Sequence, residues 1–244
     1  DKQAIASQYF SVWLKHQEDK NRVYQLEDEL PVTINSINYH PRKIKQGHLR
    51  GNAFNIKISH PEGSPSENMD KIRQIIDIIN LKGLPNYYGQ QRFGMDGDNA
   101  LKGYAILRGK KKIRNKWLGR FLVSAYQSYL FNHYMVIRLL DGLYDNILQG
   151  DIAKKHDTGG IFIVEDRKSE QERLNNKEIC YTGPVFGKKM KPAAGTSAQL
   201  EERVMEANGI TWKILYEARV KGTRRPGIII PSIQAKQAEN GIWL

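Results

Sequence analysis

The sequence predicts an α/β (α+β) protein in which short strands and packed helices share one chain. Three observations support this class. Residues 1–14 alternate between two sets of side chains with a period of two, which is typical of a strand. Residues 69–79 carry an apolar stripe at helical spacing. Residues 228–230 are three consecutive isoleucines, and such a run is typical of a short buried strand.

The first 65 residues are expected to form mainly strands. After the strand at 1–14, the polar residues 17–21 predict a turn or loop. Residues 32–39 and 53–59 predict a second and a third strand, because they are rich in β-branched and aromatic side chains. Proline and glycine within residues 61–65 then break the chain.

A helix is expected after this break. Ser66 is expected to cap its N-terminus, and Gly83 to end it. The apolar stripe of this helix comprises Met69, Ile72, Ile75, Ile76 and Ile79. With the preceding strands, the helix makes the first 84 residues an α+β unit.

The chain beyond residue 84 is expected to contain more helix. Apolar spacing predicts helices over residues 121–140, 170–175, 197–207 and 211–220. Thr196 or Ser197 is expected to cap the third of these helices. Strands are predicted at residues 159–164 and 228–230, and a strand followed by a loop at 179–191.

Composition excludes several classes of protein. Of the 244 residues, 40% are hydrophobic and 26% are charged, as in an ordinary globular protein. No apolar run approaches the roughly 20 residues that a membrane span needs, so no membrane partner is expected. Cys180 is the only cysteine, which excludes an intrachain disulfide and a cysteine-based zinc site. A single cysteine fits a reducing compartment, and we expect a cytoplasmic protein.

The charge balance favours an anionic partner. The net charge is +12, from 38 Lys and Arg against 26 Asp and Glu, and contacts to phosphates gain from counterion release. The cations gather in three clusters: Arg108, Lys110, Lys111, Lys112, Arg114, Lys116 and Arg120; Arg42, Lys43, Lys45, His48 and Arg50; and Lys188, Lys189 and Lys191. A solvated basic surface is the alternative for any one cluster. Three clusters, two of them beside the motifs described next, favour nucleic acid.

Three blocks of sequence carry a resemblance to a known family. Residues 1–8 are Asp-Lys-Gln-Ala-Ile-Ala-Ser-Gln, residues 51–54 are Gly-Asn-Ala-Phe, and residues 86–94 are Asn-Tyr-Tyr-Gly-Gln-Gln-Arg-Phe-Gly. In this order they resemble signatures of the TruD family of tRNA pseudouridine synthases. Ala6 stands where the family has Thr, and Tyr88 where it has Phe. A later helix, Ser-Ala-Tyr-Gln-Ser-Tyr-Leu-Phe-Asn from residue 124, extends the resemblance, which covers nearly all of the chain.

The resemblance implies a fold and a domain organisation. The fold is pseudouridine synthase-like, with a mixed, largely antiparallel sheet, helices, and an inserted α/β domain specific to TruD. Residues 1–84 would form the first part of the catalytic domain, residues 85–223 the insertion domain, and residues 224–244 an incomplete returning part. The family also has an upstream Lys-containing stretch and a final strand segment. We therefore expect this chain to be a fragment without the N-terminal segment and the C-terminal end, inactive by itself.

The resemblance also implies a reaction, the isomerisation of uridine 13 in the D-arm of tRNA to pseudouridine. This reaction breaks the C1′–N1 bond, rotates the uracil and rejoins it through C5. Asp1 matches the family's nucleophile, and a carboxylate can trap or stabilise the cationic sugar carbon, or assist its deprotonation. Lys2 or Arg92 would hold Asp1 ionised. The chemistry needs no metal and no cofactor, and the resemblance implies no obligate protein partner.

Residues of all three blocks are expected to contact the substrate: Lys2, Asn52, Phe54, Tyr87, Gln91 and Arg92. Asn52 would hydrogen-bond the Asp1 carboxylate or the uracil edge. Phe54 would stack on the extruded base or, alternatively, pack in the core. We favour stacking because Asn52 and Phe54 lie two positions apart, and on a strand such positions share a face and would point at the same target. Tyr88 and Phe93 are expected to pack inward. The RNA backbone is expected to contact Arg42, Lys43, Lys45, Lys110, Lys111, Lys112 and Arg114.

Two other functions stay open from the sequence. The first alternative is a non-catalytic protein or fragment that binds tRNA or another RNA. The second is an unrelated basic structural protein, which three ordered motif matches disfavour.

Overall fold

The computed structural model describes residues 5–16, 19–45, 51–59, 62, 64–238 and 241–244. The chain divides into two compact units, Asp1–Ile56 and Lys57–Leu244, and each is described by itself. The expected domain boundaries at residues 84 and 223 stay a prediction.

The first unit holds two short helices, α1 (Asp19–Tyr24) and α2 (Leu26–Glu29). The predicted strands at 1–14 and 32–39 are wrong for every described residue, because residues 5–14 and 32–39 have neither strand nor helix. A strand requires a partner that completes its hydrogen bonds, and the described backbone bonds of this unit are those of turns and helices. The predicted turn at 17–21 is also wrong from residue 19 on, where α1 begins.

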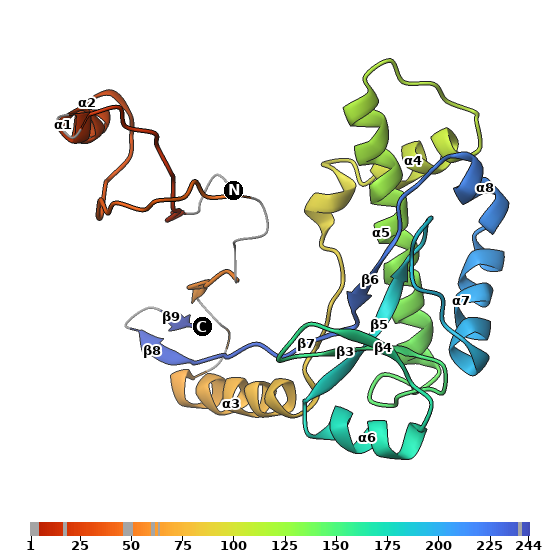
Figure 1. Cartoon of the computed structure of the whole chain (residues 1–244). Coiled ribbons are helices and arrows are strands. Elements are labelled where there is room, and N and C mark those ends of the chain that lie inside the picture. The colour runs from red at the N-terminus through yellow and green to blue at the C-terminus, as the bar shows by residue number, and fades with distance from the viewer. Residues whose placement is uncertain (1–4, 17–18, 46–50, 60–61, 63, 239–240) are drawn as a thin grey trace. The chain divides into compact units, whose positions relative to one another are not determined.

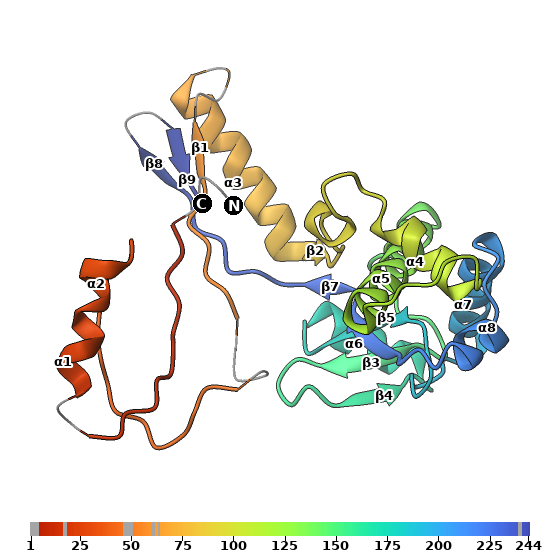
Figure 2. The ribbon, with the colours of Figure 1, turned by 90° about the horizontal axis from the view of Figure 1, so that it is seen from above.

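The second unit begins with a small antiparallel sheet in the order β1-β9-β8. Its strands are β1 (Lys57–Ser59), β9 (Gly241–Trp243) and β8 (Lys236–Ala238). Only the last three residues of the predicted strand at 53–59 are therefore a strand. Both views place α3 (Pro65–Lys82) beside this sheet (Figure 1, Figure 2).

Local chemistry sets both ends of α3. Ser64 caps it, not Ser66 as predicted: the Ser64 hydroxyl accepts from the Glu67 N–H at 3.3 Å, and the Glu67 carboxylate accepts from the Ser64 N–H at 3.1 Å. Gly83 ends the helix as expected, in a left-handed conformation with φ +72° that favours glycine. The predicted stripe is buried only in part, since Met69 is buried but Ile75 is 54% exposed.

The largest sheet of this unit has four antiparallel strands in the order β4-β3-β5-β6. These are β4 (Ile161–Ile163), β3 (Ile152–Lys155), β5 (Ile179–Val185) and β6 (Thr223–Pro226). Strand β5 lies at the centre, and six of its seven residues are buried. The strand expected at 159–164 is confirmed in its inner part, and the strand and loop expected at 179–191 are confirmed with the strand at residues 179–185. Strands β3 and β6 were not predicted.

A two-stranded ladder pairs β2 (Leu84–Pro85) with β7 (Ile228–Ile229). The predicted buried strand at 228–230 is confirmed for two residues. Only Ile228 of the three isoleucines is buried, while Ile229 and Ile230 are 45% and 37% exposed. This ladder brings the start of the third motif beside the segment around residue 226.

The helix α5 (Lys116–Leu140) runs the length of this part of the molecule (Figure 1). It begins five residues earlier than predicted, because the Asn115 side chain accepts from the N–H groups of Trp117 and Leu118 at 3.0 and 3.1 Å. The unpredicted helix α4 (Asn99–Leu107) packs against it. Gly103 permits this close approach, since a Cβ there would lie 2.1 Å from the Leu122 carbonyl oxygen.

Four further helical segments complete the unit: η1 (Gln90–Phe93), α6 (Arg167–Asn175), α7 (Gly195–Ala207) and α8 (Trp212–Glu217). The helices predicted at 170–175, 197–207 and 211–220 are confirmed with shifted ends. The predicted cap of α7 is wrong, because Ala194 precedes it without a side-chain bond. The Ser197 hydroxyl instead donates to Asp151 at 2.7 Å. Helices with antiparallel sheets confirm the α+β class.

A fully buried ion pair joins Arg138 of α5 to Asp151, just before β3. Arg138 uses all five N–H groups of its guanidinium: Nε donates to the Leu143 carbonyl, Nη1 to the Tyr134 hydroxyl and Asp151, and Nη2 to the Asn146 carbonyl and Asp151. The guanidinium also lies 3.5 Å from the ring centroid of Tyr181 in β5. Strand, helix and loop are therefore fixed to one another at this point.

None of the helices in the described part of the chain combines the length and apolar character that a membrane span requires.

Arg138→Ala is expected to lower the free energy of unfolding by about 3–5 kcal/mol, because it leaves the Asp151 carboxylate buried without its cation. Arg203→Ala is the matched control. It removes the arginine of an exposed ion pair between Arg203 and Asp141, whose side chains are 56% and 34% exposed, respectively. We expect this control to cost less than about 1 kcal/mol. Urea denaturation measures both values, and equal losses would contradict a central role for the buried pair.

Candidate functional site

The first two motifs lie in the first unit. Asp1 and Lys2 lie outside the described residues. Asn52 and Phe54 are exposed, and Phe54 shows 73% of its surface. Residues 51–56 are not a strand, so the expectation that Asn52 and Phe54 share a strand face is wrong. The exposure of Phe54 nevertheless disfavours the alternative that it packs in a core.

The third motif is clamped to α5 by one side-chain amide. The Tyr88 N–H donates to Asn132 Oδ1 at 2.8 Å, and Asn132 Nδ2 donates to the Tyr88 carbonyl at 3.0 Å. The Tyr88 ring meets Phe131 edge to face, with centroids 5.6 Å apart. Tyr88 and Phe93 pack against the core, as expected. The two family-like segments at 86–94 and 124–132 are thus one structural unit.

Arg92 is held by hydroxyl groups of the same helix. Its Nη2 donates to Ser124 Oγ at 2.7 Å and its Nε to Ser128 Oγ at 3.1 Å. Its guanidinium lies 5.3 Å from the Phe121 ring centroid. Within the described residues it forms no ion pair with a carboxylate. The Arg92 charge is therefore oriented but not neutralised, which suits an anionic ligand.

A second arginine, Arg225 of β6, contacts this motif, although it lies far from it in the sequence. Its guanidinium donates to the carbonyl and the side-chain oxygen of Asn86, and it lies 4.0 Å from the Tyr88 ring centroid. The Asn86 amide in turn donates to the Pro226 carbonyl at 2.8 Å. Arg225 also forms no ion pair among the described residues. The sequence did not single it out, because its contact with Asn86 spans 139 positions.

Tyr87 and Gln91 are exposed, as are Gly89 and Gln90 between them. Tyr87 is 37% exposed, and burial of the rest of its side chain raises the pKa of its hydroxyl. Its phenol therefore stays protonated at neutral pH and can both donate and accept a hydrogen bond. The Gln91 side chain lies on the surface of η1. The packed residues of the motif thus present an exposed phenol and an exposed amide beside Arg92.

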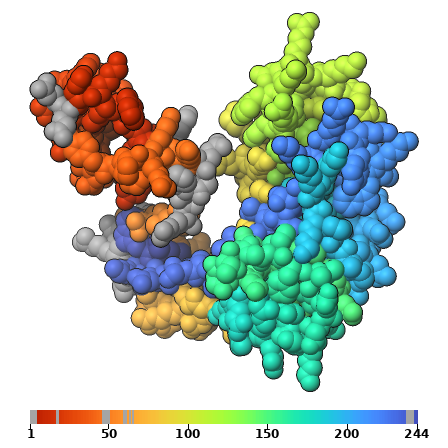
Figure 3. All heavy atoms as spheres, viewed as in Figure 1, coloured from red at the N-terminus to blue at the C-terminus, as the bar shows by residue number. Residues whose placement is uncertain are grey.

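The predicted basic residues lie on exposed segments. Lys110, Lys111, Lys112 and Arg114 lie in the loop 108–115, which joins α4 to α5. Figure 1 shows this loop, in yellow-green, at one end of α5, and Figure 3 shows yellow-green spheres of this part of the chain projecting from the surface. The N–H groups of Lys110 and Lys111 donate to the Ala105 carbonyl and fix the start of the loop. Arg42, Lys43 and Lys45 are exposed on the first unit.

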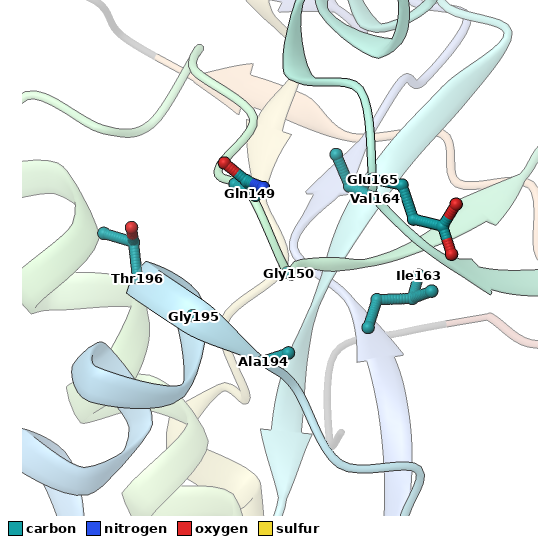
Figure 4. A pocket seen from close by; sticks show the side chains of 8 residues that line it. All are labelled: Gln149, Gly150, Ile163, Val164, Glu165, Ala194, Gly195 and Thr196. Carbon is teal, nitrogen blue, oxygen red and sulfur yellow. The ribbon is translucent and has the colours of Figure 1, made fainter.

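A separate pocket of about 460 Å³ lies where α7 begins (Figure 4). Its walls are Gln149, Gly150, Ile163, Val164, Glu165, Ala194, Gly195 and Thr196. The one ionisable side chain in this wall is the carboxylate of Glu165, which repels phosphate. We do not assign this pocket to the site.

Two other chemistries find no support in the described residues. These residues contain no group of three or more His, Cys, Asp or Glu side chains that could hold a metal ion. Burial raises the pKa of the Cys180 thiol to about 11, so that it stays protonated and unreactive at neutral pH.

Comparison with known proteins identifies the family of this chain. The family model of tRNA pseudouridine synthase D (TruD) matches residues 1–119 and 111–244. A tRNA pseudouridine synthase D of Thermus thermophilus is 39% identical over 246 residues, which cover 100% of this chain and 66% of the relative. One of Nitratiruptor is 35% identical over 256 residues, covering 91% of this chain and 69% of the relative.

A solved structure shows the shared fold. The crystal structure of a protein from Methanosarcina mazei, described as a tRNA pseudouridine synthase D, superimposes with a TM-score of 0.68 at 20% identity. The superposition covers 83% of this chain and 66% of that chain. This chain spans just under two thirds of the length of the Thermus relative. Its matches to the family model and to these relatives show that the chain belongs to the tRNA pseudouridine synthase D (TruD) family.

Proposed function

We propose that the protein isomerises a uridine of tRNA, uridine 13 of the D-arm, to pseudouridine, with Asp1 as the nucleophile. Membership of the family carries this proposal, because relatives along the whole chain are named tRNA pseudouridine synthase D. Pseudouridine formation needs a carboxylate at the sugar carbon, a surface for the extruded base and cations for the RNA backbone. Asp1 supplies the carboxylate. The described residues support the presence of a surface for the base and of cations for the RNA backbone.

The geometry of the third motif supports a role in holding the substrate. Arg92 and Arg225 carry charges that no described carboxylate neutralises, and both flank the Tyr88 ring, at 5.8 and 4.0 Å from its centroid. Helix α5 fixes their surroundings before any ligand binds, which reduces the entropy lost on binding. We assign Arg92, Tyr87 and Gln91 to contacts with the tRNA near the target uridine. Lys2, Asn52 and Phe54 complete the proposed substrate contacts from the other two motifs.

The distribution of cations supports tRNA as the partner. The loop 108–115 is exposed and contains five Lys or Arg residues and no Asp or Glu. We assign Lys110, Lys111, Lys112 and Arg114, with Arg42, Lys43 and Lys45, to the RNA backbone. Such contacts position an RNA and carry no sequence information, so they fit a substrate recognised by its shape. Cytoplasmic tRNA is the proposed substrate pool.

In the whole protein, Asp1→Asn is expected to abolish pseudouridine formation, because the amide cannot act as a nucleophile at the sugar carbon. The affinity for tRNA should stay within about tenfold, or roughly 1.4 kcal/mol. Carbodiimide-blocked primer extension measures the product, and filter binding measures the affinity. Asp28→Asn, at an exposed carboxylate of α2, is the control and should leave turnover unchanged. Normal turnover by the Asp1 variant would refute the assignment.

Asn132→Ala is expected to loosen the third motif, because it leaves the Tyr88 N–H and carbonyl without partners. An unsatisfied buried polar group costs about 1–3 kcal/mol. Hydrogen exchange of the peptide covering 86–94 should accelerate, and turnover should fall by at least about fivefold, the rate equivalent of 1 kcal/mol. Val136→Ala, one turn further along α5 at an exposed position, should change neither. Unchanged exchange in the Asn132 variant would contradict the clamp.

Replacing Lys110, Lys111 and Lys112 together by glutamine is expected to weaken tRNA binding and flatten its salt dependence. Each lost phosphate contact should lower the log–log salt slope by about 0.7 to 0.9. A variant with Lys71, Lys168 and Lys213 replaced by glutamine changes the net charge equally at three dispersed exposed positions. It should keep the original slope. Equal slopes for both triple variants would assign the loop to a merely solvated surface.

A further inference from the structure

Two aromatic rings on the first turns of α5 stack on each other, and the guanidinium of Arg92 from η1 lies over one of them. The rings of Trp117 and Phe121 lie 5.6 Å apart, centroid to centroid, with only 9° between their planes. On Phe121 lies the guanidinium of Arg92, 5.3 Å from the ring centroid. A guanidinium, a phenyl ring and an indole thus follow one another from the third motif towards the basic loop. Trp117 ends this series.

Trp117 is the most exposed of the three tryptophans in the second unit. Its side chain shows 70% of its surface, whereas Trp212 shows 37% and packs against Phe186 and Tyr216. Asn115 fixes the backbone beneath Trp117, because its side chain accepts from the Trp117 N–H. Tryptophan is a large apolar residue, and a monomeric fold gains little by holding one in solvent. A rigid exposed indole is instead a surface on which another planar group can stack.

The surroundings of Trp117 favour a polyanion. Residues 108–120 contain seven Lys or Arg residues and no Asp or Glu. None of these cations forms an ion pair within the described residues, and the first turn of α5 has no acidic residue. Cations such as Lys116 at a helix N-terminus oppose the helix dipole, so the fold alone does not favour them. A bound phosphate group would relieve this repulsion.

We propose that Trp117, Phe121 and the basic loop form a platform on which an unpaired base of the RNA stacks while its phosphates contact the loop cations. This inference rests on the proposed RNA substrate and adds a contact outside the three motifs. An aromatic ring among free cations is the arrangement that binds single-stranded nucleic acid without reading its sequence. Trp117 is therefore assigned to positioning the tRNA, at the end of a stack that Arg92 begins.

The test compares single-stranded and duplex RNA on the full chain. The probe is a fluorescein-labelled oligouridine of about twelve nucleotides, either alone or annealed to oligoadenosine, in anisotropy titrations. Trp117→Ala should raise the Kd for the single strand by roughly 5-fold to 100-fold, because one base loses its stacking partner. The Kd for the duplex and both salt slopes should stay unchanged, because duplex bases are already stacked and no charge is removed. Trp117→Phe should restore most of the single-strand affinity.

Leu140→Ala is the matched control, since Leu140 is an 81% exposed apolar residue at the other end of the same helix. It should change neither Kd. An equal loss for single strand and duplex, or no loss for either, would overturn the platform. So would a Trp117→Ala defect seen only with anionic phosphatidylglycerol vesicles, which would assign Trp117 to membranes.

A parallel pseudouridine assay on the unsubstituted whole protein separates this inference from the proposed function. Normal turnover with no single-strand defect in the Trp117→Ala variant would overturn the platform alone. Absent turnover, with the predicted difference between single strand and duplex intact, would overturn the proposed function and keep the platform.

Discussion

The buried pair of Arg138 and Asp151 is the constraint on which the second unit depends. A buried guanidinium is tolerable only when each N–H has a partner, and here the partners come from α5, the loop after it and the residue before β3. Asp151 also accepts from Ser197 at the start of α7. These elements therefore have one permitted arrangement. A second buried pair, Arg224 with Glu201, lies beside it, and burial raises the pKa of the Glu201 carboxyl although Arg224 acts in the opposite direction.

The candidate site depends on this constraint through a single helix. Arg138, in the last turn of α5, forms the ion pair, and the middle of the same helix presents Ser124, Ser128 and Asn132 to the third motif. These three positions are spaced by four residues and so lie on one face of the helix. Because α5 is continuous, a well-fixed core at one end positions the Arg92 guanidinium at the other.

Much of the second unit could be predicted from the sequence, because its signals are local. Periodic apolar residues and capping side chains mark α3 and α5, although Ser64 and Asn115 shift their starts. Helix α4 was missed because Gly103 weakens its pattern, and that glycine is needed for contact with α5. The predictions of strands in the first unit were wrong because an alternating pattern of side chains shows only that a segment suits a strand. It does not show which other segment would pair with it. Arg225 could not be foreseen, since only the β2–β7 pairing brings it to Asn86.

The single cysteine has a practical consequence for spectroscopy. Cys180 is buried at the centre of the sheet, and its thiol stays protonated in the neutral range. A cysteine introduced at an exposed position, such as Lys112 of the basic loop, would have an ordinary thiol and react far faster with a maleimide dye. Dyes can therefore be attached at one chosen position without first removing the native residue. Distances between the loop and a labelled RNA then become measurable on the native sequence background.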